Sequence, residues 1–151
     1  MSFPPSRYMA TALAEAARAA ERGEVPVGAV IVDPDGRVVA AAGNRTRELN
    51  DPTAHAEVLA VRAACVAAGS DRLPRHDLYV TLEPCPMCAA AIGFARIARL
   101  YYGAADAKSG GVEHGARIFS HSTCHHSPTV FGGIGEAAAA ALLTDFFTER
   151  R

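Results

Sequence analysis

Two short segments of this 151-residue sequence carry side chains that can bind a transition metal. The first is His55-Ala56-Glu57, and the second, about 30 residues later, is Pro84-Cys85-Pro86-Met87-Cys88. Two thiolates and one imidazole form a ligand set that suits zinc. Cys85 and Cys88 are three residues apart, so within a helix their side chains share one face. The two segments therefore predict a zinc site held by His55, Cys85 and Cys88.

The number of protein ligands indicates what such a zinc ion would do. Structural zinc sites normally have four protein ligands, whereas catalytic sites keep one position open for water. Zinc lowers the pKa of a bound water to about 7, which makes that water a nucleophile near neutral pH. Glu57 lies two residues after the imidazole and is placed to take the proton of that water. We therefore expect hydrolytic chemistry with Glu57 as the proton carrier.

Helix signals in the sequence predict the elements that position the two segments. Both segments fall at the N-termini of predicted helices, where the helix dipole lowers the pKa of a thiolate and favours metal binding. Pro86 suits the first turn of the second of these helices. The predicted helices cover residues 6–22, 54–68, 86–98 and 136–150.

Strand and turn signals complete the predicted fold. The predicted strands cover residues 27–32, 37–42, 78–82 and 100–103, and residues 106–133 are predicted to be loop-rich. Asp33-Pro34-Asp35-Gly36 is a strong turn signal between the first two strands and predicts a hairpin. Strands that alternate with helices predict a single α/β domain over residues 1–151, in three layers with helices on both faces of one sheet. Because the first two strands form a hairpin, we expect a mixed sheet.

Composition bounds the class of protein. Half of the residues are hydrophobic and 21% are charged, which excludes a disordered or collagen-like chain. No apolar run approaches the roughly 20 residues that span a bilayer, and the N-terminus lacks a signal-peptide pattern. We therefore expect a soluble, cytoplasmic protein without a membrane partner, whose four cysteines bind metal or stay free. The formal net charge of −1 is not that of a dedicated nucleic-acid binder.

The order His-x-Glu and then Pro-Cys-x-x-Cys resembles the signature of zinc-dependent deaminases. The resemblance extends over nearly the whole chain and is closest to the bacterial tRNA-specific adenosine deaminases. It implies a three-layer α/β/α cytidine-deaminase-like fold with a mixed five-stranded sheet, in one CMP/dCMP-type deaminase domain over residues 1–151. It also implies a homodimer with one Zn²⁺ per subunit. The segments that carry the resemblance are Glu24–Ala29, Gly43–Arg45, Asp51–Glu57, Tyr79–Cys85, Asp106–Gly110 and Asp145–Phe147.

The same resemblance implies an activity and a set of site residues. The activity is hydrolytic deamination of the wobble adenosine, position 34 of a tRNA, to inosine with release of ammonia. His55, Cys85 and Cys88 correspond to zinc ligands, and Glu57 corresponds to the catalytic proton shuttle. The residues implied to bind the tRNA anticodon stem-loop are Asn44, Ala56, Pro84, Asp106, Lys108, Phe147, Arg150 and Arg151.

Two other functions stay open at this point. The same chemistry on a free base or nucleoside, of guanine or cytosine type, would not need the basic groove that RNA phosphates favour. A non-catalytic zinc-binding partner module would need a fourth ligand, from Cys124 or a neighbouring histidine. The loop at residues 106–133 contains His121, Cys124, His125 and His126. Their spacing matches no common zinc pattern, although some of these side chains could contact substrate.

Overall fold

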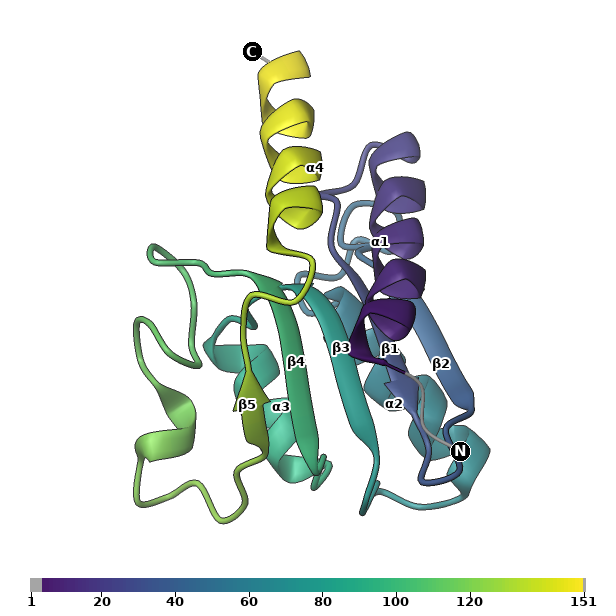
Figure 1. Ribbon diagram of the computed structural model, residues 1–151, viewed down its shortest axis with the longest axis vertical. Helices are drawn as coiled ribbons and strands as arrows, with labels where there is room; N and C mark the ends of the chain where they lie inside the picture. The colour runs from purple at the N-terminus through teal and green to yellow at the C-terminus, as the bar shows by residue number, and fades with distance from the viewer. Residues whose placement is uncertain (1–3, 151) are drawn as a thin grey trace.

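A computed structural model describes residues 4–150 of the chain, which build one five-stranded sheet flanked by helices (Figure 1). The strands are β1 (Gly28–Val32), β2 (Val38–Gly43), β3 (Asp77–Leu82), β4 (Arg99–Ala104) and β5 (Thr129–Phe131). The helices are α1 (Pro5–Glu21), α2 (Ala56–Ala68), α3 (Pro86–Phe94) and α4 (Glu136–Glu149), with a short 3₁₀ helix, η1 (Ile118–Ser120). Among residues 4–150, no helix combines the length and apolar character that crossing a membrane requires.

The sheet is mixed, as the sequence predicts. Its strand order is β2-β1-β3-β4-β5, and β1 runs antiparallel to both of its neighbours. The β3–β4 and β4–β5 pairs are parallel. The predicted hairpin forms because Asp33 Oδ1 accepts the N–H groups of Asp35 and Arg37, each at 2.9 Å, while Gly36 adopts a left-handed φ of 86°. An aspartate that bonds to the backbone two residues ahead is a standard turn device.

Helices cover both faces of the sheet, which confirms the three-layer α/β/α architecture. Figure 1 shows α1 in front of the sheet, α4 beside α1 and rising past the upper ends of β3 and β4, and α2 and α3 behind the sheet. Successive strand residues point to opposite faces, so β3 contributes to two cores. Leu78 and Val80 are buried with residues of α2 and α3. Tyr79 is buried with Tyr101 of β4 and Met9 of α1 on the other face.

The predicted helix boundaries need two corrections. The third helix ends at Phe94 rather than at Ala98, because Arg96 adopts a left-handed φ of 64° and turns the chain toward β4. Ala98 is already outside the helix, and its N–H donates to His76 O at 2.8 Å. The second helix begins at Ala56 rather than at Ala54.

Residues 106–133, predicted as loop from local signals, contain η1 and the fifth strand. β5 has only three residues, and it pairs with the start of β4 through Arg99↔Thr129, Leu100↔Val130 and Tyr101↔Phe131. A segment this short carries no usable periodicity. Its strand conformation therefore depends on the neighbouring strand, and only the family resemblance implied a fifth strand.

We expect Gly28→Ala to destabilise the protein strongly, because α1 lies directly on β1 at this glycine. A Cβ at Gly28 would lie 2.0 Å from Ala12 O and 2.6 Å from Ala16 N, both of them backbone atoms. Overpacking of this kind costs roughly 1–3 kcal/mol or more in free energy of unfolding. Urea unfolding at fixed zinc content measures the loss.

Gly69→Ala is the matched control for Gly28→Ala. A Cβ at Gly69 would meet nothing within 4 Å, although its φ of 64° is left-handed. The control should therefore show only the backbone penalty, about 1–2 kcal/mol. Equal or larger losses in the control would contradict close packing of α1 on β1.

Candidate functional site

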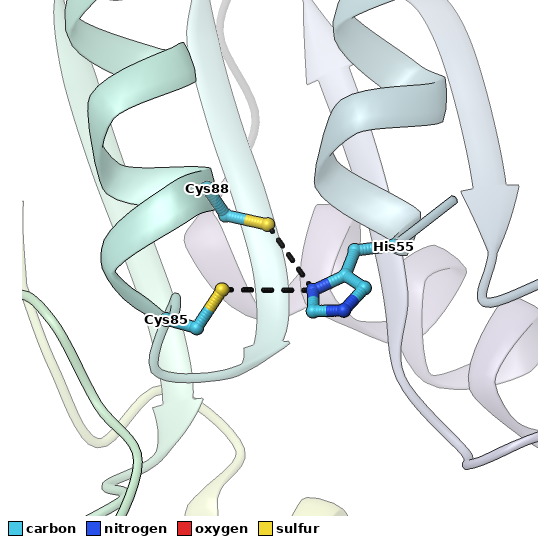
Figure 2. Close-up of side chains that lie close together, drawn as sticks. All are labelled: His55, Cys85 and Cys88. Carbon is cyan, nitrogen blue, oxygen red and sulfur yellow. Dashed lines mark hydrogen bonds between the residues drawn. The ribbon is translucent and has the colours of Figure 1, made fainter. Parts of the chain in front are cut away.

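The three predicted metal ligands lie together where α2 and α3 begin. His55 is the N-cap residue of α2 and Cys85 is the N-cap residue of α3, each with an extended backbone. β3 ends at Leu82, three residues before Cys85, and Pro86 occupies the first turn of α3. Figure 2 shows both cysteine sulfurs facing the same nitrogen of His55. The helix N-termini place their positive dipole ends beside the two sulfurs.

The spacing of the ligand atoms fits zinc. The distances to His55 Nδ1 are 3.6 Å from Cys85 Sγ and 3.4 Å from Cys88 Sγ. Tetrahedral zinc, with its usual bond lengths to sulfur and nitrogen, places such atoms roughly 3.5–3.6 Å apart. Within residues 4–150, this trio is the only group of three or more potential ligands whose ligand atoms all lie within 4.8 Å of one another. A zinc ion bound by this trio would therefore have three protein ligands, the number typical of a catalytic site.

The protonation equilibria of the trio also favour metal binding. A hydrogen bond with the Cys88 thiol is the main reason that the pKa of Cys85 falls to about 4. The same interaction, with burial, raises the pKa of Cys88. The hydrogen bond to Cys85 raises the pKa of His55. A thiolate that forms below neutral pH is the form that binds metal, and binding of the ion would release the protons that remain.

Glu57 is a buried carboxyl group in the first turn of α2, two residues after His55. Only 4% of the residue is exposed, and burial raises the pKa of Glu57 to about 7. A general acid or base works best when its pKa lies near the working pH. Glu57 is thus able to take up a proton and to give it back near neutral pH.

A cavity of about 270 Å³ opens over the metal ligands. It brings together six of the residues predicted from the sequence: Asn44, His55, Ala56, Glu57, Cys85 and Asp106. Pro84 does not line it; the residue is buried, and its carbonyl accepts the N–H of Gly111 at 2.8 Å. Lys108 is exposed and does not line the cavity, whereas the next residue, Ser109, does.

A second cavity, also about 270 Å³, adjoins the first and shares Val25 and Thr46 with it. Phe147 and Arg150 of the C-terminal region line this second cavity. Phe147 is half exposed, and the guanidinium of Arg150 lies 3.6 Å from the ring centroid of Phe146. The remaining predicted contact, Arg151, lies outside the described residues.

Sequence reasoning missed several lining residues, of which Glu83 is the most unusual. It is 2% exposed and lies two residues before a metal ligand. Despite its burial, hydrogen bonds from the backbone of Asp106 and from His114 hold the pKa of Glu83 below its usual value. The sequence did offer a signal for Glu83, namely its position between a predicted buried strand and the Pro84-Cys85 segment. The other missed residues are Val25, Val27, Thr46, Leu82 and Ser109.

The histidine-rich loop residues do not reach the metal ligands and do not gather into a second metal group among the residues described. They line a separate cavity of about 470 Å³ beside α3. His121 Nε2 contacts Ala116 O at 2.6 Å, and His126 Nε2 contacts Ile97 O at 2.7 Å. The Cys124 thiol donates to the carbonyl of His126. Only the His126 contact joins the loop to the chain between α3 and β4, and the other two contacts stay within the loop.

Comparisons with known proteins agree with this site. Residues 4–104 match the family described as the cytidine and deoxycytidylate deaminase zinc-binding region. The tRNA-specific adenosine deaminase of Agrobacterium fabrum is 62% identical to this chain over 146 residues, 97% of this chain and 95% of that protein.

Two solved structures are similar in fold and in sequence. One comes from a study of A-to-I editing by tRNA:A34 deaminases at the wobble position of transfer RNA. It is 63% identical, with a TM-score of 0.89, and the match covers 91% of this chain and 99% of that one. The other is a guanine deaminase from Bacillus subtilis, 40% identical, with a TM-score of 0.66 over 68% of this chain and 66% of that one.

Proposed function

The chain belongs to the cytidine and deoxycytidylate deaminase zinc-binding family, and we propose that it deaminates the wobble adenosine of a tRNA to inosine. The observation that carries this proposal is the end-to-end likeness, at 62% identity, to a tRNA-specific adenosine deaminase. The pocket supports it chemically, because a buried carboxyl with a pKa of about 7 stands beside a three-ligand zinc site. Adenosine and water would give inosine and ammonia.

The residues of the pocket divide this reaction among them. His55, Cys85 and Cys88 would hold the zinc, which when bound would supply an activated water as the nucleophile for C6 of adenine. Glu57 takes a proton into its carboxylate and delivers it to N1 of the base. The same carboxyl group then takes the second proton of that water, from the hydroxyl formed on C6, and passes it to the amino group, which leaves as ammonia. One residue can serve both steps because its pKa lies near neutrality.

The RNA contacts form the second part of the proposal. Asn44 is 7% exposed and lines the pocket, where its side-chain amide would contact the target nucleotide. A base reaches such a pocket only when it is splayed out of its loop. We assign contacts with the surrounding anticodon stem-loop to Ala56, Asp106, Lys108, Phe147, Arg150 and Arg151, and no longer to Pro84, because that residue is buried outside the pocket lining.

Deamination of a free base is the second candidate function. The specific observation in its favour is the likeness to a guanine deaminase at 40% identity, together with a net charge of −1. Deaminase folds share their catalytic core, and the shape of the pocket selects the base. The two functions therefore differ in the substrate that enters, while the metal site stays the same.

A paired assay with one enzyme preparation distinguishes these functions. One reaction contains an anticodon stem-loop with adenosine at the wobble position, and parallel reactions contain free guanine, cytosine and adenosine. We expect inosine in the RNA and no ammonia from the free compounds. Ammonia from a free base, with intact adenosine in the RNA, would replace the proposed function by the second candidate.

We also propose that residues 1–151 form one deaminase domain that acts as a homodimer in the cytoplasm. The family resemblance supports the dimer, and Phe94 on α3, 75% exposed, offers an apolar side chain to a second copy. Sedimentation equilibrium at micromolar concentration should give the mass of two chains. The mass of a single chain of 15.8 kDa would contradict the dimer.

A further inference from the structure

Two buried carboxylates beside the pocket have no part in the proposed chemistry. Glu24 and Glu83 are each 2% exposed, and neither belongs to the metal-ligand group. A buried carboxylate is costly unless hydrogen bonds stabilise its charge. The partners that stabilise these two carboxylates therefore indicate what each of them does.

Glu24 binds the backbone of the loop between β2 and α2. Its Oε1 accepts the N–H of Arg47 at 3.2 Å, and its Oε2 accepts the N–H of Glu48 at 2.8 Å. The same loop contributes Asn44 and Thr46 to the lining of the pocket. Glu24 itself precedes β1, so it anchors this loop to the sheet.

Glu83 binds the loop that follows β4 in the same way. Its Oε1 accepts the N–H of Asp106 at 3.0 Å and lies 2.7 Å from His114 Nδ1. Its Oε2 accepts three consecutive backbone N–H groups, at 3.2, 2.9 and 3.0 Å, from Val112, Glu113 and His114. This loop contributes Asp106 and Ser109 to the pocket.

The number of hydrogen-bond donors around Glu83 argues against a catalytic role for its carboxylate. A carboxylate offers about four lone-pair sites, and five donors surround Glu83. Its oxygens are therefore occupied, although the residue lines the pocket. The Cβ that Gly110 lacks would lie 2.6 Å from Glu83 Oε2, which shows how closely the loop packs against this carboxylate.

We propose that Glu24 and Glu83 are positioning residues, each of which holds one of the two loops that line the pocket in its binding-competent conformation before substrate arrives. Loss of such a clamp lowers the fraction of molecules with a formed pocket. The apparent affinity for substrate falls by that fraction. The proton carrier and the metal ligands stay in place because they belong to α2 and α3.

The kinetic test uses the zinc-loaded full chain and the anticodon stem-loop substrate, and this part rests on the proposed function. We expect Glu24→Ala to raise KM about tenfold, with kcat changed by less than about twofold and the zinc content unchanged. Glu24→Gln keeps one accepting oxygen and should restore part of the KM. It also keeps the test available if Glu24→Ala does not fold.

Glu48→Ala is the matched control. It removes one negative charge from the same loop but leaves the backbone N–H of residue 48 free to donate to Glu24. The side chain of Glu48 only pairs with Arg22 and Arg45 at the surface. We expect KM to stay within about twofold of the wild-type value. A tenfold rise in this control would show that charge, rather than loop position, determines KM.

Hydrogen exchange tests the clamps without any substrate. In Glu24→Ala the amides of Arg47 and Glu48 should exchange faster, while those of residues 112–114 should not change. In Glu83→Gln the amides of residues 112–114 should exchange faster and those of Arg47 and Glu48 should not change, with a similar rise in KM, because the one remaining oxygen cannot accept from all five donors around residue 83. Unchanged exchange would overturn the proposal, and so would faster exchange with wild-type KM. A wild-type enzyme that leaves the RNA intact would refute the proposed function instead, and the exchange experiment would still decide on the clamps.

Discussion

Glu57→Ala is expected to keep zinc and to lose turnover. The residue lies at the start of α2, is not one of the three metal ligands and carries a carboxyl group whose pKa is raised to about 7 by burial. Proton transfer by a positioned side chain contributes roughly 10²–10⁴-fold to a rate. We therefore expect kcat to fall by about that factor, while metal analysis still finds one zinc per chain.

Glu57→Gln is the matched variant for this prediction. It preserves the volume of the side chain and its place in the pocket but cannot carry the proton. If it is as inactive as Glu57→Ala, the loss reflects proton transfer rather than an empty space. Turnover at the wild-type rate in either variant would remove Glu57 as the proton shuttle.

Cys88→Ala should lose both the metal and the activity. Cys88 is fully buried at the start of α3, and its sulfur lies 3.4 Å from His55 Nδ1. Its removal leaves two protein ligands, whereas zinc sites normally have at least three. We expect the zinc content measured by elemental analysis to fall from one per chain toward zero, with turnover falling in proportion. Cys85→Ala should behave in the same way.

Cys65→Ala and Cys124→Ala are the controls for the metal site. Both cysteines are free, but Cys65 packs against the core behind the sheet and Cys124 donates to a loop carbonyl. Each control should keep one zinc per chain and close to wild-type turnover. Stoichiometric zinc in Cys88→Ala, or its loss in Cys124→Ala, would point to a different ligand set.

The structural features that the sequence predicted correctly are local in the chain. Cys85 and Cys88 share a helix face because of their separation, and Pro86 marks where that helix begins. The hairpin followed from one turn signal, which formed as expected around Asp33. Such features depend on neighbouring residues, so a single sequence contains enough information to predict them.

The fifth strand and the end of α3 could not be predicted from local signals. β5 is a strand because its three residues pair with β4. α3 stops four residues early because Arg96 takes a left-handed conformation and the chain joins β4. In both places, packing against a neighbouring strand overrides the local conformational preference. Helix propensity and periodicity describe only neighbouring residues, so they do not predict this effect.

By itself, the sequence determined the ligand types, their spacing along the chain and the carboxylate beside them, and these indicate zinc-dependent hydrolytic chemistry, while the resemblance to a known family implied deamination. Only the tertiary structure decided which residues surround that chemistry. It places Glu24 and Glu83 under two loops that are distant from them in sequence, and it keeps Pro84 and Lys108 out of the lining. The physical reason is that a buried carboxylate must find hydrogen-bond donors wherever the fold supplies them. Those donors are backbone groups 23 to 31 residues away from the carboxylates.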